Sequence, residues 1–402
     1  MALMPVAEAY AAVLKDAGAL PEETVELNDA FHRTLSRDVA ALRTQPPVAL
    51  SAMDGYAVRA ADAAPGARLK VIGEVAAGRP FNQTIGAGQA ARIFTGGVIP
   101  GGVDAVVIQE DTTRDGDIVI VNETITTGRN IRPAGIDFRE GDVLLPRGTL
   151  LNDRALALAA AMNHPRLPVH RRPKIAILAT GDELVPPGTT PGPGQIVHSN
   201  VFALAALARS EGADVAELGI ARDTLEDTSG GIRRARDLGA DVLITTGGAS
   251  VGDHDLVQAA LKAEGFDMAF WKIALRPGKP MMNGRLGAMR VLGLPGNPVS
   301  SYVCAFLFLV PLIRSLSGRT MVDHPLEHAL LGRELPANDK RQDYLRARLA
   351  PGGDGMPVAT SVGAQDSSLV ANLAAANALI VRPPHAPAAP AGSPCTILRL
   401  PN

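Results

Sequence analysis

The sequence predicts an α/β plus β protein: a central three-layer α/β/α domain, an inserted small β-domain and a C-terminal β-domain. Three short apolar runs in the middle third of the chain each end in a glycine-bearing loop, with helix-like stretches between them. Such alternation is typical of a parallel or mixed sheet with helices on both faces. At 402 residues the chain exceeds one ordinary hydrophobic core, so roughly two to four domains are expected.

The N-terminal part of the chain predicts a helix followed by a β-domain. Residues 5–19 space Ala, Val and Leu along one helical face and end near Gly18. Between 45 and 150, Gly and Pro recur every few residues among short β-forming runs, which indicates a small domain with tight turns. Asn152 precedes an Ala-rich stretch at 153–162, and we expect its side chain to cap a helix there.

Residues 170–318 carry the pattern of the α/β domain. Residues 224–227 resemble a capping box with Asp in place of Glu, so a helix is expected to begin there. Asn200 is expected to cap another helix, and Gly318 to end the last one. Residues 323–402 return to short alternating segments, which predicts the C-terminal β-domain. We expect strands at 174–180, 214–220, 241–246 and 289–294, and further helices at 201–211, 255–264 and 299–317.

The three glycine-bearing loops are predicted to meet at one edge of the sheet, because the carboxyl ends of parallel strands share an edge. The loops contain Gly181, Gly247 and Gly296. Glycines at such an edge let the backbone approach a phosphate, and carboxylates beside them can hold a divalent cation. The pattern therefore indicates a small-molecule enzyme that acts on a phosphorylated compound.

The stretch Gly248-Ala249-Ser250-Val251-Gly252 also matches the nucleophile elbow of serine hydrolases. A hydrolase would need an acid and then a histidine further along the chain. The later histidines fall in or near the C-terminal β-domain, and the loop carries Asp253 and Asp255, which suit a cation better. The hydrolase is therefore the weaker alternative.

Arg276 and Lys279 stand in the proline-stiffened loop Arg-Pro-Gly-Lys-Pro, after an apparent strand at 268–274. Composition alone favours a solvated turn, the usual place of a charged loop. The alternative is an anion clamp, in which the prolines lower the cost of ordering the basic side chains. The residues alone leave both interpretations open.

Composition excludes several classes of protein. With 39 basic and 41 acidic residues, the net charge of −2 gives no reason to expect nucleic acid or an anionic membrane as a partner. Cys304 and Cys395 form no CxxC, which excludes a cysteine zinc site and suits a reducing cytoplasm. The N-terminus lacks a basic leader, and the most apolar stretch, 302–313, is expected to break at Pro311, too short for a membrane span. We expect a soluble cytoplasmic protein.

Six motifs change the interpretation of these loops. In chain order they are SAMDGYAVR at 51–59, RIFTGG at 92–97, TGDEL at 180–184, GGxSVGxxD at 247–255, RPGKP at 276–280 and LPGNPVS at 294–300. Together they resemble the molybdopterin molybdenumtransferase family, which comprises the MoeA proteins and the E-domain of gephyrin. Residues 372–383 resemble the end of that family's last domain, so the resemblance covers nearly the whole chain.

The resemblance implies an elongated four-domain protein that forms a homodimer. The family joins molybdate to the dithiolene of adenylylated molybdopterin and releases AMP, with Mg²⁺ at the phosphates. The implied domains are an α/β region that includes 1–21, 41–48 and 132–140; an elongated linker and dimerisation domain at 22–40 and 141–163; a small β-domain at 49–131; the α/β molybdopterin-binding domain at 164–322; and the C-terminal β-domain at 323–402.

The resemblance also implies which residues form the site. Asp54 and Thr95 would face the cleft from the partner's β-domain, and Glu183 and Asp255 would bind Mg²⁺. The remaining implied catalytic residues are Asp137 and Asp223, from the α/β region, and the implied substrate-binding residues are Gly247, Gly248, Ser250, Arg276, Lys279, Pro295, Pro298 and Arg346.

The chain departs from the family pattern at two places. Val48-Ala49-Leu50 stands where the family usually has Phe-Asp-Asn, and Gly363-Ala364 stands where a Gly-Ser resembles a molybdate contact. Two related functions remain as alternatives: a molybdopterin adenylyltransferase, usually the α/β domain alone, and a non-catalytic scaffold like gephyrin. The β-domains on both sides of the α/β domain favour the molybdenum-inserting enzyme.

Overall fold

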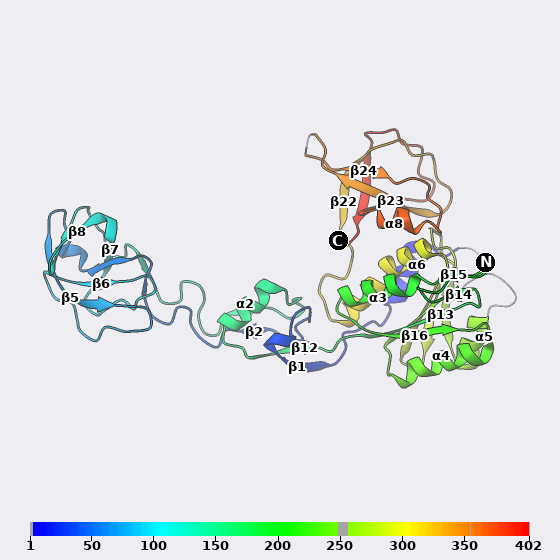
Figure 1. The fold of residues 1–402 in the computed structure, drawn as a ribbon, viewed down its shortest axis with the longest axis horizontal. Helices are drawn as coiled ribbons and strands as arrows, with labels where there is room; N and C mark the ends of the chain where they lie inside the picture. Colours follow the sequence, from blue (N-terminus) through cyan, green and yellow to red (C-terminus); the bar gives the residue numbers. More distant parts are fainter. Residues whose placement is uncertain (1–2, 248–255, 354, 402) are drawn as a thin grey trace.

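The computed structural model describes residues 3–247, 256–353 and 355–401 and shows an elongated chain (Figure 1). A β half-barrel occupies one end, a narrow elongated domain lies in the middle, and the α/β and C-terminal domains lie together at the other end. The predicted elongated, multidomain architecture is confirmed.

The α/β domain is built on a mixed sheet in the order β16-β13-β17-β21-β20-β18. The first four strands pair in parallel, whereas β20 pairs antiparallel with both of its neighbours, β21 and β18. The apparent strand at 268–274 is β18, which lies at the antiparallel edge. The strands are β13 (Lys174–Thr180), β16 (Asp214–Ala221), β17 (Val242–Thr246), β18 (Asp267–Trp271), β20 (Met282–Leu286) and β21 (Met289–Leu294).

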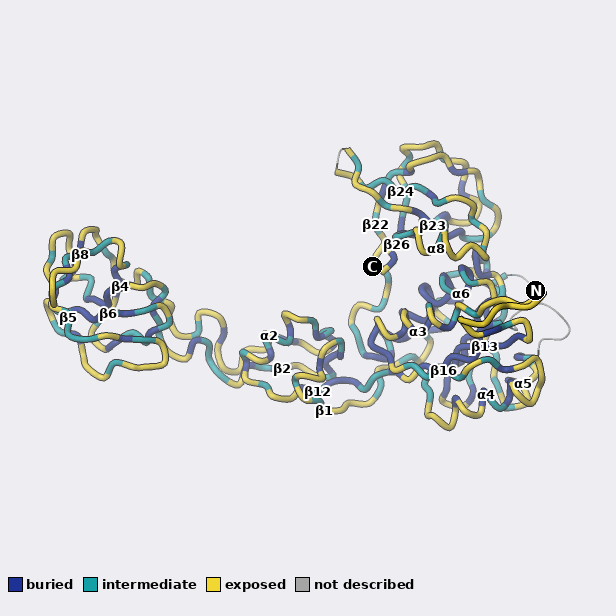
Figure 2. The backbone as a smooth tube through the Cα atoms, in the orientation of Figure 1, coloured by how far each residue is buried: buried dark blue, intermediate teal, exposed yellow. Residues whose placement is uncertain are grey.

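Helices cover both faces of this sheet, as predicted. Ile177 of β13 packs in a cluster with Leu204 of α3. The next residue, Leu178, packs in a different cluster with Ile232 of α4, because successive strand side chains point to opposite faces. One face carries α4 (Leu225–Asp237) and α5 (Leu256–Ala263); the other carries α1 (Val6–Leu14), α3 (Asn200–Ser210), α6 (Pro298–Cys304) and α7 (Val310–Leu316). Figure 2 shows β13 buried between these layers.

Two predicted helix caps are confirmed and one is wrong. The Thr224 side chain accepts a hydrogen bond from the Asp227 backbone N–H at 3.1 Å, and Asn152 accepts one from Ala155 at 2.9 Å. Asn200 instead lies inside the first turn of α3, so its side chain is free to bond elsewhere. Its amide donates to the carbonyl of Gly296 at 2.7 Å.

The predicted helix break at Pro311 is also wrong. The helix runs from Pro298 to Leu316 through a π-helical turn, η4 (Ala305–Leu309), and Pro311 lies in the first turn after it. The wider π turn accommodates the proline ring and its missing N–H. This helix is long and apolar enough to cross a membrane by length and composition, but 83% of its apolar 18-residue window is buried inside the protein. It is therefore the central core helix of the α/β domain.

The elongated domain is a small unit with its own core. Its strands pair as β1 with β12 and β2 with β11, and α2 packs beside them. Because β12 pairs with β1, residues 166–170 belong here rather than to the α/β domain, where we had predicted them. The elements are β1 (Glu22–Glu26), η1 (Leu27–Asp29), β2 (Val39–Ala40), β11 (Val143–Leu145), α2 (Asp153–Ala161) and β12 (Arg166–His170).

The segments 41–48 and 132–140 were predicted in the α/β region, and the structure places them elsewhere. They run side by side between the elongated domain and the half-barrel, joined by the Gln45–Phe138 bridge. Ala41 and Phe138 are buried in the hydrophobic cluster of the elongated domain. The earlier assignment fails because these segments contact one another instead of the α/β sheet.

Both predicted β-domains are present. The half-barrel sheet has the order β7-β4-β6-β5-β9-β8, and the C-terminal sheet closes on itself because β23 pairs with both β24 and β25. The half-barrel region contains β3 (Leu50–Ser51), β4 (Gly55–Val58), η2 (Ala60–Asp62), β5 (Arg68–Val75), β6 (Gln89–Ile93), β7 (Ala105–Ile108), η3 (Gln109–Asp111), β8 (Thr112–Asp115), β9 (Ile118–Val121) and β10 (Ile131–Arg132). The C-terminal domain contains β22 (Leu326–Leu331), β23 (Gln342–Ala350), β24 (Val358–Ser361), α8 (Val370–Ala374), β25 (Ala378–Arg382) and β26 (Pro394–Arg399).

Glu211, just after α3, binds the end of α7 and the segment that follows it toward the C-terminal domain. Its carboxylate accepts from Arg314 at 2.7 and 3.0 Å and from Arg319 at 2.7 Å. Burial alone would raise the pKa of Glu211, but the hydrogen bond and charge of Arg314, followed by those of Arg319, hold that pKa below its ordinary value. The three side chains form a buried ionic cluster.

We predict that Glu211→Gln lowers the free energy of unfolding by about 3 kcal/mol at neutral pH, because two buried guanidinium groups lose their counter-charge. The wild-type contribution is complete above the ordinary pKa of 4.5 and is lost as the pH falls below it, since the folded-state pKa is lowered. Urea unfolding at a series of pH values measures both effects. Glu217→Gln, which breaks the exposed pair with Arg209, is the control and should cost about 1 kcal/mol or less. Equal losses in the two variants would contradict the prediction.

Candidate functional site

The three glycine-bearing loops meet around one pocket, as the sequence predicted. The pocket has a volume of about 440 Å³ and is lined by Thr180, Glu183, Gly247 and Gly296 from these loops. Ser368 and Val370 line it from the C-terminal domain. The site therefore lies at the carboxyl edge of the parallel strands, where the α/β and C-terminal domains meet.

Backbone contact between the loops depends on Gly247. Its φ is +93°, and a Cβ there would lie 2.4 Å from the carbonyl oxygen of Thr180. A Cβ on Gly296 would lie 3.7 Å from the Cα of Gly247, which is ordinary van der Waals contact. The ends of β13 and β17 thus approach as closely as they do because position 247 has no side chain.

Carboxylates gather beside this pocket. Glu183 is exposed on the pocket wall. Asp182 and Asp223 lie at the ends of neighbouring strands, and each accepts a hydrogen bond from the backbone N–H of the other, at 3.1 and 3.3 Å. Asp223 is therefore near the predicted site without lining the pocket, and Asp182 is a neighbour that the sequence analysis did not select. The predicted residues Gly248, Ser250 and Asp255 lie outside the described residues.

One wall of the pocket was not predicted. It consists of residues 196–200, which run from β15 (Ile196–Val197) into α3. β15 pairs with β14 (Leu184–Val185), and the His198 ring stacks on Phe202 with centroids 5.5 Å apart. Only its position in the sequence could have predicted that this segment lines the pocket, because it lies between a glycine-bearing loop and the helix that follows.

The C-terminal domain is fixed to the pocket through Ser367. Its hydroxyl accepts from the Asn297 side chain at 2.8 Å, and its carbonyl accepts from the Val299 backbone N–H at 3.0 Å. Pro298 lines the pocket, whereas Pro295 is buried behind it. The loop that carries Ser368 is thereby held against the start of α6.

Arg346 lies behind that loop and is fully buried. Its Nη2 donates to the carbonyls of Ala364 at 3.2 Å and Asp366 at 3.0 Å. Its Nε and Nη1 have no hydrogen-bond partner among the described residues. A buried guanidinium with unpaired donors is suited to an anion, since burying such donors without a partner is costly.

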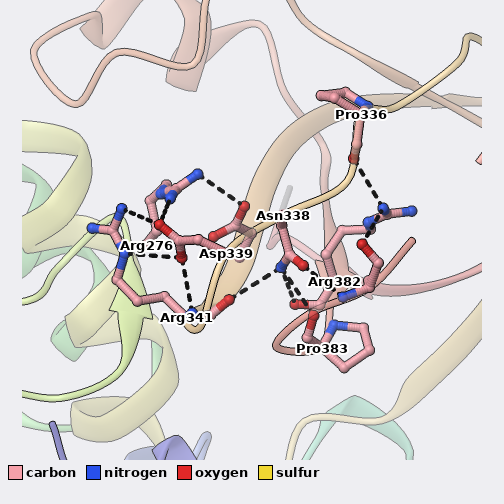
Figure 3. Close-up of polar contacts among 9 residues, drawn as sticks. Arg276, Pro336, Asn338, Asp339, Arg341, Arg382 and Pro383 are labelled. Atoms are coloured by element: carbon pink, nitrogen blue, oxygen red, sulfur yellow. Dashed lines mark hydrogen bonds and ion pairs between the residues drawn. The ribbon is translucent and has the colours of Figure 1, made fainter. Parts of the chain in front are cut away.

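Arg276 is neither a solvated turn residue nor a free cation. It lies on β19 (Leu275–Arg276), which pairs with β23, and it forms an ion pair with Asp339 (Figure 3). A second ion pair joins it to Asp343 at 3.3 Å. Both carboxylates belong to the C-terminal domain, so Arg276 joins the two domains. Lys279, in contrast, is exposed and has no ion pair or hydrogen bond from its side chain to any described residue.

Asp54 and Thr95 come together in the half-barrel. Oδ1 of Asp54 accepts from both the backbone N–H and the hydroxyl of Thr95, each at 2.7 Å. These two bonds, the backbone one first, hold the pKa of Asp54 below its ordinary value. The pair lies at the opposite end of the chain from the pocket (Figure 1). Asp137 was predicted in the α/β region. It lies instead, exposed, in the connection between the half-barrel and the elongated domain, where its backbone N–H donates to the carbonyl of Gln45.

The chain matches known proteins over nearly all of its length. Residues 4–163 match the MoeA N-terminal region (domains I and II), residues 176–315 a probable molybdopterin binding domain, and residues 328–400 the MoeA C-terminal region (domain IV). A molybdopterin molybdenumtransferase of Nostoc sp. is 37% identical over 388 residues, which is 94% of this chain and 89% of that protein. The chain belongs to the MoeA family. Another relative in the family, the molybdopterin molybdenumtransferase of Bacillus subtilis, is 36% identical over 94% of this chain and 90% of its own length.

A solved structure agrees with the MoeA assignment. The molybdopterin biosynthesis MoeA protein from Pyrococcus horikoshii superimposes with a TM-score of 0.83 at 29% identity, covering 100% of both chains. The similarity therefore includes the half-barrel and the elongated domain as well as the α/β domain.

We predict that Gly247→Ala lowers the free energy of unfolding by about 1–3 kcal/mol, because a side chain there meets the Thr180 carbonyl and φ is positive. Gly296→Ala is the matched control in the same pocket, since its Cβ would meet only an ordinary van der Waals contact at 3.7 Å. Denaturant unfolding of the two variants measures the difference. If Gly296→Ala is as destabilising as Gly247→Ala, close backbone approach at Gly247 is not what shapes the pocket.

Proposed function

We propose that this chain is a molybdopterin molybdenumtransferase of molybdenum cofactor biosynthesis, which joins molybdate to the dithiolene of adenylylated molybdopterin and releases AMP. The observation that carries the proposal is the pocket where three glycine loops of the α/β domain meet a loop of the C-terminal domain that shields a buried arginine. The curated relatives at 36–37% identity carry the same enzyme name.

The arrangement favours this enzyme over the two related alternatives. A molybdopterin adenylyltransferase is expected to need the α/β domain alone, whereas here Ser368 and Val370 of the C-terminal domain line the pocket. A non-catalytic scaffold would not require the exposed carboxylate of Glu183 at the pocket wall. Both features suit a catalyst that holds a phosphoanhydride and a second anion together.

Two basic side chains, Arg346 and Lys279, are the candidates for binding molybdate. Molybdate is a tetrahedral dianion, which is bound well by guanidinium and ammonium donors. Arg346 offers two unpaired donors, and Lys279 is free of other partners among the described residues. Ser367 and Ser368 lie on the loop that contains Ala364. The Ser367 hydroxyl accepts from Asn297 and keeps its own proton to donate to an anion, whereas the Ser368 hydroxyl donates to Asp366.

The carboxylates fit a magnesium ion at the phosphates. Mg²⁺ is usually held by one or two carboxylates together with substrate phosphates, so a cage of three protein ligands is not needed. Within the described residues no such cage occurs. Glu183 and Asp255 would hold the ion, and it would supply positive charge where the phosphoanhydride breaks.

We further propose that the enzyme is a homodimer in the cytoplasm and that each site uses two chains. Asp54 and Thr95 lie in the half-barrel, far from the pocket of their own chain. A second copy would bring its half-barrel to this pocket, since a two-fold contact repeats the same patches on both subunits. Asp54 and Thr95 would then act on the substrate held by the partner's loops, with Asp137 on the same arm.

The function is tested by measuring AMP released from adenylylated molybdopterin with and without molybdate. The proposal expects AMP only when molybdate is present, together with a molybdenum-containing product. AMP release that ignores molybdate, or no release by a folded protein, would overturn it.

Removal of magnesium should stop AMP release, and added Mg²⁺ should restore it. We predict that Glu183→Gln raises the Mg²⁺ concentration for half-maximal activity by about tenfold or more, since one ligand charge is lost. Asp255→Ala should act in the same direction. Glu226→Gln, an exposed carboxylate in the first turn of α4, is the control and should titrate like wild type. Unchanged titrations of both site variants would contradict the magnesium assignment.

A further inference from the structure

Arg92 contacts the residues that adjoin the Asp54–Thr95 pair. Arg92 lies on β6, directly opposite Tyr56 of β4. Its Nη1 donates to the carbonyl of Gly55 at 2.8 Å, and its Nη2 donates to the side chain of Gln109. The guanidinium therefore bridges β4 and the short helix η3.

These two segments are the ones that fix the backbone at Asp54. The carbonyl of Asp54 accepts from the backbone N–H of Gln109 at 3.0 Å. The next residue, Gly55, is pressed against β7, because a Cβ there would lie 1.9 Å from the carbonyl oxygen of Val107. Arg92 links the two segments by side-chain bonds as well, since it donates both to the carbonyl of Gly55 and to the side chain of Gln109.

Arg92 also reaches the neighbour of Thr95. Its guanidinium carbon lies 4.7 Å from the ring centroid of Phe94 and 5.3 Å from that of Tyr56. Phe94 directly precedes Thr95, and Tyr56 is two residues from Asp54. One planar cation thus contacts the chain on both sides of the carboxylate–hydroxyl pair.

We propose that Arg92 is the positioning residue of the Asp54–Thr95 pair and acts on the reaction only through Asp54. The inference rests on the proposed function, which places Asp54 at the substrate. A carboxylate that must meet a substrate bound to another subunit needs a fixed geometry, and small displacements of such groups are costly. After the two bonds from Thr95, the charge of Arg92 also contributes to the lowered pKa of Asp54.

Arg114 provides a matched control. Its guanidinium lies 5.8 Å from the centroid of the same Tyr56 ring, but its Nε bonds to the Gly116 carbonyl of its own hairpin. Arg114→Gln therefore removes one charge and one cation–ring contact without touching the backbone around Asp54. Any effect of Arg92→Gln that Arg114→Gln lacks reports on the Asp54 surroundings.

The test measures AMP release, thermal unfolding and KM for adenylylated molybdopterin in the full-length enzyme. Arg92→Gln should lower kcat by about tenfold or more, while Arg114→Gln stays near wild type. Arg92→Lys should recover part of the loss, because lysine keeps the charge but cannot donate to both Gly55 and Gln109 as the guanidinium does. In an Asp54→Asn background, Arg92→Gln should cause no further loss, since the group that it positions is already disabled.

Each other outcome overturns the inference. If Asp54→Asn lowers kcat but Arg92→Gln does not, or if the two losses multiply, Arg92 does not act through Asp54 and the proposed function stands. If Asp54→Asn itself keeps full activity, the placement of Asp54 at the substrate fails as well. Equal losses in Arg92→Gln and Arg114→Gln would assign Arg92 to packing alone. If Arg92→Gln does not fold, the comparison of Arg92→Lys with Arg114→Lys decides, and equal activity overturns the proposal.

Discussion

The two extended segments 41–48 and 132–140 hold the half-barrel away from the α/β domain, and the two-chain site that we propose depends on this separation. The segments support each other through backbone bonds at 2.9 Å from Gln45 to Phe138 and from Gly135 to Pro46. Their inner end is anchored because Ala41 and Phe138 are buried in the elongated domain. The Asp54–Thr95 pair therefore lies in a domain far from the pocket of its own chain.

At the other end of the molecule, the site depends instead on close contact between loops and between domains. Gly247 lets the ends of β13 and β17 meet, and Ser367 ties the C-terminal domain to the start of α6. Arg276 also joins the two domains, because it pairs with Asp339 and Asp343 of the C-terminal domain. Asp343 lies three residues before Arg346 on β23, and the same strand thus carries the domain contact and the buried guanidinium.

Local patterns in the sequence were sufficient for the α/β domain. Alternating apolar runs and glycine loops predicted β13, β17 and β21 and their common edge, because strand period and turn chemistry are local properties. The six motifs then identified the family that the comparisons confirm. What failed were features set by distant contacts. The placement of 41–48 depends on 132–140, and the partners of Arg276 lie more than sixty residues away. The continuation of the helix through Pro311 has a local cause, the preceding π turn, which the sequence pattern did not indicate.

The most direct test of the two-chain site is complementation between inactive subunits. An Asp54→Ala chain and a Glu183→Ala chain are mixed in equal amounts, subunit exchange is verified by mass spectrometry of tagged copies, and AMP release is measured. Each heterodimer would contain one site with neither defect, so the exchanged mixture should recover about a quarter of wild-type activity. Activity no higher than that of the two parents, with exchange verified, would show that each site is built within one chain.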